Sequence, residues 1–117
     1  MHVSERIRQI EDTVRRYAFV QWTIKVDETR YSIKYRLHIE ADLFVQVYFN
    51  ERSGTIGLAL IHRGQRLYGR DCEAGRWHRH PDDEPTVHDA SPDGARVVSL
   101  EEFLAEVQDV LIRNDLI

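Results

Sequence analysis

The amphipathic pattern at the start of the chain is helical. Apolar residues from Ile7 to Tyr17 recur every three or four positions, and the positions between them are mostly polar. This spacing predicts a helix over 4–17 that packs on other elements through its apolar side.

Strand patterns follow this helix. The segment YSIKYRLHIE, 31–40, alternates apolar and polar residues without interruption, which is typical of a strand with one buried side. Similar runs predict four further strands, at 19–26, 43–50, 55–62 and 66–71. The turns between these runs are too short for crossover connections, so we expect an antiparallel meander of five strands.

A second helix is predicted near the end of the chain. Ser99 and Glu102 have the spacing of a capping box, and an apolar series at helical spacing follows them. We therefore expect a helix over 99–113. Residues 72–98, which hold three prolines and no periodic pattern, are expected to form an irregular loop.

Together these elements predict a single two-layer α+β domain of 117 residues. The N-terminal and C-terminal helices would pack on one face of a five-stranded antiparallel meander. The other face also carries apolar residues, among them Phe44, Tyr48 and Ile61. We expect the loop with Trp77, or a second chain in a homodimer or complex, to cover that face.

Composition restricts the classes of partner. No apolar run approaches the roughly 20 residues of a membrane span, and no signal-peptide pattern opens the chain, so we expect no membrane contact and a cytoplasmic location. The single Cys72 fits a reducing compartment. Net charge is −4, with 12 Lys and Arg against 9 Asp and Glu in residues 1–71 and 4 against 11 in residues 72–117. The strongly basic footprint of a duplex nucleic-acid binder is absent.

The stretch RWHRHPDDEPTVHD, 76–89, holds three of the six histidines and is the candidate site. Histidine exchanges protons near neutral pH, and arginine stabilises charge that develops on phosphate, so such a loop suits RNA cleavage. Asp71 would orient a histidine or bind a metal. The predicted catalytic residues are His78, His80, His88 and Asp71, and the predicted substrate-binding residues are Tyr68, Arg70, Arg76 and Arg79.

A zinc site is an alternative use of the same stretch. Cys72 and the three histidines are potential ligands, and Asp82, Asp83 or Asp89 would complete the set. No HExxH or CxxC spacing is present, so the sequence predicts no cofactor, and zinc stays an open alternative.

A small cationic group is expected on the polar side of the first strands. Lys34 and Arg36 share one side of their strand, and Lys25 is expected beside them if the two strands pair. Such a group would suit contact with RNA. His38, which lies between Arg36 and Glu40, is expected to be exposed to solvent.

The second half of the chain resembles the TumE-type toxin family of prokaryotic toxin–antitoxin systems. The resemblance covers about the last 75 residues and runs through YGRD, WHRHP, PTVHD and SLEEFLAEV. The matching positions are Tyr68, Asp71, His78, His80, Pro81, His88 and 99–106. The resemblance implies a toxin with a separate antitoxin protein as its partner, and RNA or nucleotide metabolism as its target.

The sequence therefore predicts a toxin-like protein that acts on RNA through its histidine-rich stretch. The alternative is a non-enzymatic module that forms a homodimer or binds another protein through its sheet.

Overall fold

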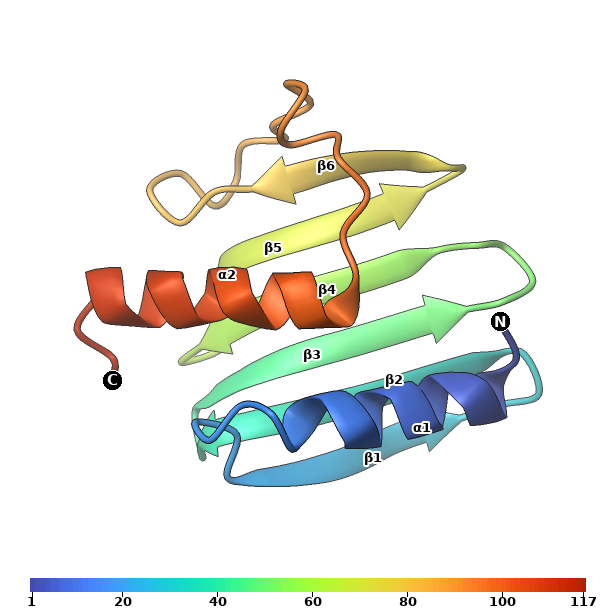
Figure 1. Cartoon of the computed structure of the whole chain (residues 1–117). Coiled ribbons are helices and arrows are strands. Elements are labelled where there is room, and N and C mark those ends of the chain that lie inside the picture. The colour runs from blue at the N-terminus through green and yellow to red at the C-terminus, as the bar shows by residue number, and fades with distance from the viewer.

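The computed structural model describes all residues 1–117 as two helices and six strands (Figure 1). The elements, in chain order, are α1 Val3–Val14, β1 Trp22–Glu28, β2 Ser32–Glu40, β3 Leu43–Asn50, β4 Ile56–His62, β5 Gln65–Glu73, β6 Arg76–His80 and α2 Leu100–Arg113.

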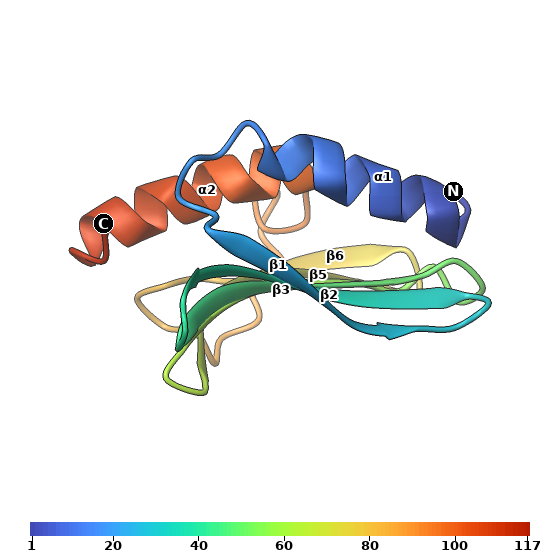
Figure 2. The ribbon, with the colours of Figure 1, turned by 90° about the horizontal axis from the view of Figure 1, so that it is seen from below.

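The six strands form one antiparallel sheet in sequence order, and both helices lie on the same face of it (Figure 2). α1 lies over the β2 side of the sheet and α2 over the β4 and β5 side. The predicted α+β class and the meander are confirmed. We refer to the sheet face away from the helices as the open face.

The prediction of five strands is wrong by one, because β6 lies inside the segment expected to be irregular. Its sequence, RWHRH, has polar residues on both sides of a single tryptophan, so no apolar stripe marks it as a strand. Backbone pairing with β5 holds it, from Gly69 opposite His80 to Glu73 opposite Arg76. An edge strand held in this way depends on its neighbour rather than on its own hydrophobic pattern.

The first strand is also displaced from its predicted range. β1 begins at Trp22, because turns fill the chain between α1 and Gln21, and it continues to Glu28 with an irregularity between Lys25 and Asp27. Every residue of β1 is exposed. Trp22 pairs with His38, so its side chain lies on the open face and not among the core residues.

Both helices end close to the predicted positions. α2 has Ser99 as its N-cap, with the Ser99–Glu102 capping box formed in both directions. α1 starts one residue earlier than predicted, with His2 as the cap, and ends at Val14. Tyr17 lies beyond the helix, where its hydroxyl donates to the backbone carbonyl of Glu101 at 3.0 Å and links the two helices.

A core of 22 buried residues fills the space between the sheet and the helices. One cross-strand row of the sheet, Leu37, Val45, Leu60 and Tyr68, shows the register that brings apolar side chains to this side. Phe103 and Leu104 of α2 are fully enclosed in the same core. Neither helix has the length and apolar character that crossing a bilayer requires.

The contribution of the helix layer to the free energy of unfolding can be measured with substitutions in α2. Leu104→Ala should lower the free energy of unfolding by about 2–5 kcal/mol, because it leaves a cavity at a side chain with no exposed surface. Ile112→Ala on the same helix should change it by less than about 0.5 kcal/mol, since Ile112 is 57% exposed. Urea denaturation of both variants compares them, and equal losses would contradict the placement of α2.

Candidate functional site

Strand alternation divides the predicted site residues between the two faces of the sheet. Along β5, Tyr68, Arg70 and Cys72 point to the helices, and the intervening Asp71 points to the open face, where it lies opposite His78. Along β6, Arg76, His78 and His80 share the open face, and Trp77 and Arg79 lie on the helix side. The sequence predicts a single loop site for all of these residues, whereas the structure divides them between two faces.

The open face brings together all four predicted catalytic residues, His78, His80, His88 and Asp71, which we call the histidine cluster. The Nε2 atoms of His78 and His80 are 3.2 Å apart. Oδ2 of Asp71 is 3.5 Å from Nε2 of His78 and 3.3 Å from Nε2 of His80. Each of the three histidines offers a ring nitrogen within 4.8 Å of the others. The Asp71 carboxylate and the His78 and His80 rings therefore converge on one point, and His88 lies beside them.

A reversal of the chain after β6 brings in the third histidine. The backbones of Arg79 and Asp89 exchange two hydrogen bonds, of 2.9 and 2.8 Å, so the return segment runs antiparallel to β6. His88 consequently lies beside His80, with ring centroids 4.6 Å apart, and stacks on His78 at 4.7 Å. The segment between Pro81 and Val87 is the turn that makes this possible.

His80 is the most strongly positioned member of the cluster. Its side chain is 5% exposed, and its Nδ1 lies 2.9 Å from the carbonyl oxygen of Pro85. A carbonyl only accepts hydrogen bonds, so Nδ1 carries a proton, and in the neutral ring Nε2 is the acceptor that faces Nε2 of His78. Burial, together with the nearby Arg66 guanidinium, lowers the pKa of His80 and favours the neutral ring.

Two arginines border the cluster. Nη1 of Arg66 is 3.4 Å from Oδ2 of Asp71, and the Arg66 side chain lies over Gly69, with its Cδ 3.5 Å from the position that a Cβ would take there. Arg76, the first residue of β6, is the second arginine. They line an open depression of about 500 Å3 together with the cluster and Glu73. No hydrophobic residue lines it, so it suits a charged or strongly polar ligand rather than an apolar one.

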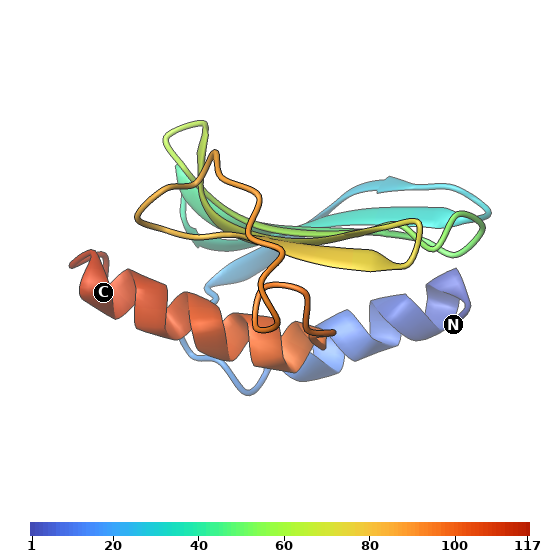
Figure 3. The same cartoon turned by 90° about the horizontal axis from the view of Figure 1, so that it is seen from above.

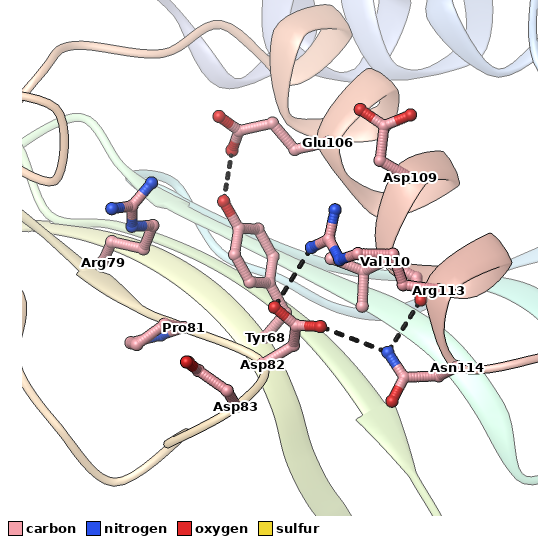
Figure 4. Close-up of a pocket in the computed structure, with 10 residues that line it drawn as sticks. All are labelled: Tyr68, Arg79, Pro81, Asp82, Asp83, Glu106, Asp109, Val110, Arg113 and Asn114. Atoms are coloured by element: carbon pink, nitrogen blue, oxygen red, sulfur yellow. Dashed lines mark hydrogen bonds and ion pairs between the residues drawn. The ribbon is translucent and has the colours of Figure 1, made fainter.

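The remaining substrate-binding candidates lie on the helix side of the sheet. Arg70 is fully buried, and its guanidinium forms two hydrogen bonds to the Glu106 carboxylate, of 3.0 and 2.7 Å. The Tyr68 hydroxyl donates to the same carboxylate at 2.8 Å (Figure 4). The backbone carbonyl of Asp93 accepts a further bond from Arg70. These contacts anchor α2 and the preceding segment to β5, which is a structural role.

Arg79 also has a structural role. Its guanidinium binds the carboxylates of Asp89 and Asp93. Hydrogen bonds from Ser91, and then from Arg79, lower the pKa of Asp89 to about 2. The ion pairs fasten the return segment to β6 as it crosses the sheet edge toward α2 (Figure 3). Arg79 therefore does not reach the histidine cluster and positions it only through the backbone.

The sulfur and the aspartates considered for a zinc site lie elsewhere. Cys72 and Trp77 are paired neighbours in the helix-side core. Asp82 binds Arg113 and Asn114 of the α2 end, in a cleft of about 650 Å3 on that side (Figure 4). The expectation that Trp77 covers the open face is wrong, because its side chain lies on the helix side of β6.

An aromatic strip lies on the open face, at the opposite edge of the sheet from the cluster. Trp22 stacks on His38 with ring centroids 4.9 Å apart and planes within 4°, and His38 contacts Phe44 at 4.9 Å. The guanidinium of Arg36 lies 4.8 Å from the Phe44 ring centroid. His38 is thus buried between two aromatic rings rather than exposed to solvent as predicted.

The expected cationic group is smaller than predicted. Lys25 pairs with Tyr35 across the strands and so points to the helix side, where its Nζ binds Glu28 at 2.8 Å. Lys34 and Arg36 stay on the open face without it.

The chain matches no known family model, no characterised protein and no solved structure. The resemblance to TumE-type toxins therefore rests only on the sequence segments YGRD, WHRHP, PTVHD and SLEEFLAEV.

Two parts of this geometry were missed from the sequence. Arg66 is only the first residue of a predicted strand, but a strand irregularity between Arg66 and Asp71 brings their side chains together. The expectation that Lys25 lies beside Lys34 and Arg36 puts Trp22 on the core side of its strand, whereas the structure places Trp22 on the open face.

The Tyr68–Glu106 contact has a consequence for stability at high pH. Burial, followed by the hydrogen bond to Glu106, raises the pKa of Tyr68 from its usual value of 10.0 to about 12. The folded state therefore holds the proton more tightly than the unfolded state, and this part of the stability is complete below pH 10 and lost as pH rises toward 12. We expect a loss of about 1–2 kcal/mol, reduced by water in the cleft.

Tyr68→Phe removes this titration and serves as the comparison. Its unfolding free energy should fall less steeply than that of the wild type between pH 10 and pH 12, as measured by urea denaturation at several pH values. Parallel curves for the two proteins would contradict the assigned shift.

Proposed function

We propose that this protein is a toxin-like enzyme that cleaves RNA at the histidine cluster on the open face of its sheet. The observation that carries the proposal is the convergence of the His78 and His80 imidazoles on the Asp71 carboxylate, with His88 beside them, in a depression that Arg66 and Arg76 also line. Clusters of titratable groups in a polar depression are typical of catalytic sites.

The chemistry that fits these groups is internal transfer at a phosphodiester. The RNA 2′-oxygen attacks phosphorus, the bond to the 5′-oxygen breaks, and the proton of the 2′-hydroxyl passes by way of the cluster to the leaving 5′-oxygen. The products are a 2′,3′-cyclic phosphate and a 5′-hydroxyl. Arg66 and Arg76 supply the positive charge that stabilises the phosphate as negative charge develops on it.

The same face offers a surface for the rest of an RNA strand. Trp22 is 44% exposed although one side of its ring stacks on His38, so the other side is free for a base. Lys34 and Arg36, on the strand next to Trp22, supply positive charge for the backbone. A single strand laid across the sheet from β1 to β6 would reach both the aromatic strip and the histidine cluster.

A non-enzymatic pairing module is the second candidate, and one observation favours it. β1 is an edge strand that is exposed throughout, with Trp22, Ile24 and Val26 each more than 40% exposed. Such an edge suits pairing with a strand of an antitoxin or of a second copy. This candidate predicts association without RNA cleavage, so the assays below separate the two.

Loss of the cluster should abolish toxicity. Induced expression of the wild type should arrest growth, and His78→Ala combined with His80→Ala should relieve the arrest. Asp71→Asn, which keeps the shape of the side chain, should slow cleavage of single-stranded RNA by about 100-fold or more, because it removes the charge on which the imidazoles converge. Product analysis should detect a 2′,3′-cyclic phosphate end.

His62→Ala is the matched control, since it removes a histidine at the end of β4 that makes no contact with the cluster. It should arrest growth like the wild type. Thermal unfolding of each variant checks that the fold is retained. A harmless wild type, or full activity in Asp71→Asn, would overturn the proposal.

Trp22 should report RNA binding directly. In a Trp77→Phe background it is the single tryptophan, and its exposed ring should lose fluorescence when a single-stranded oligonucleotide stacks on it. Trp22→Ala should weaken binding by about 1–3 kcal/mol in a filter-binding assay. Lys25→Ala, a loss of positive charge on the other face of the same strand, should have little effect, and equal losses for the two variants would contradict the assigned face.

A further inference from the structure

We infer that the histidine cluster is a binding site for a divalent transition-metal ion of the zinc class. The inference concerns the cofactor of the proposed site, and its connection to RNA cleavage rests on the proposed function. It begins from three donor atoms, Nε2 of His78, Nε2 of His80 and Oδ2 of Asp71, which are separated by 3.2, 3.3 and 3.5 Å.

These separations match one face of a tetrahedron around a metal. Bonds of about 2.0–2.1 Å from zinc to histidine nitrogen or carboxylate oxygen place tetrahedral ligands roughly 3.3–3.4 Å apart. Ligands at right angles in an octahedral site, with bonds of similar length, would lie only about 2.9–3.0 Å apart. The observed spacing therefore favours the four-coordinate geometry of zinc over the octahedral geometry of magnesium or non-haem iron.

The donor types lead to the same class of ion. Two imidazoles and one carboxylate make a mixed nitrogen and oxygen donor set that suits zinc, whereas calcium and magnesium prefer sets made of oxygen alone. The structure brings two imidazole nitrogens and a carboxylate oxygen within 3.5 Å of one another. A cation at their centre would interact favourably with all three.

Contacts outside the donors hold them in the orientation that a metal needs. The hydrogen bond from Nδ1 of His80 to the carbonyl of Pro85 leaves Nε2 without a proton and aimed at the site. This arrangement, a ligating ring nitrogen with its partner nitrogen bound to a backbone carbonyl, is common around zinc. Arg66 steadies the Asp71 carboxylate from the side at 3.4 Å.

The fourth position faces the depression. His88 offers a nitrogen within 4.8 Å of those of the other two histidines, and it is an exposed residue of the return segment. It is placed either to complete the coordination or to stand beside a bound water or phosphate oxygen. A position open to solvent is typical of catalytic rather than structural zinc.

An ion in this position would act directly on the proposed reaction. It would polarise the phosphate and lower the pKa of a hydroxyl that binds to it. His78 and His80 would then serve as ligands, and proton transfer would fall to the groups around the open position.

Direct measurement of metal binding tests the inference. Protein prepared without a histidine tag and dialysed against EDTA should bind one Zn2+ per chain in calorimetry, and Co2+ should give the intense visible absorption of a four-coordinate site. His78→Ala and His80→Ala should each weaken Zn2+ binding by more than about 100-fold, because each removes a ligand. His88→Ala should weaken it less.

Two controls exclude other binding sites. Cys72→Ser and His62→Ala should bind Zn2+ like the wild type, since Cys72 lies in the core on the opposite face and His62 lies outside the depression. Absence of saturable binding, binding that persists in His80→Ala, or octahedral Co2+ spectra would each overturn the inference.

RNA cleavage by the EDTA-treated and Zn2+-loaded proteins separates this inference from the proposed function. Zinc binding in a protein that cleaves no RNA in either form supports the metal site and overturns the function. Cleavage by a protein that binds no zinc supports the function and overturns the metal site. Cleavage that EDTA abolishes and Zn2+ restores supports both.

Discussion

The antiparallel pairing of β6 with β5 creates both chemically distinct surfaces of this protein. Because side chains alternate along each strand, one register fixes which residues face the helices and which face outward. With Asp71 opposite His78 and Cys72 opposite Trp77, the carboxylate meets the imidazoles on one side and the tryptophan enters the core on the other. A shift of one residue would bury the histidines and expose Trp77.

The buried charge of Arg70 is the second constraint, and it connects this edge of the sheet to α2. An unpaired guanidinium in the core would be strongly destabilising, but here the Glu106 carboxylate and two backbone carbonyls accept all of its hydrogen bonds. No buried side-chain polar atom lacks a partner. The pairing holds the segment before α2 against β5, and that segment includes the residues that bind Arg79. In this way the charges on the helix side determine where the return segment runs, and with it the position of His88.

Local periodic signals explain why much of the fold was predictable. Alternation marks the buried side of β2, and apolar runs mark β3 and β4 as buried strands. The capping box marks the start of α2. These elements lie where the patterns indicate. β6 was missed because four of its five residues are polar, so that its conformation depends on pairing with β5. β1 was misplaced because an exposed edge strand has no buried side for its alternation to mark.

For the site, the sequence by itself determined which residues are chemically able to act: three histidines close together in the chain, with arginines and aspartates around them. Only the tertiary structure decided which of these meet. Asp71 joins the histidines, Tyr68, Arg70 and Arg79 turn to the helices, and Arg66 enters from the far end of β5. The physical reason is that side-chain type is a local property of the chain, whereas the face of a sheet on which a residue lies depends on the register between strands. That register is decided by the burial of the whole core.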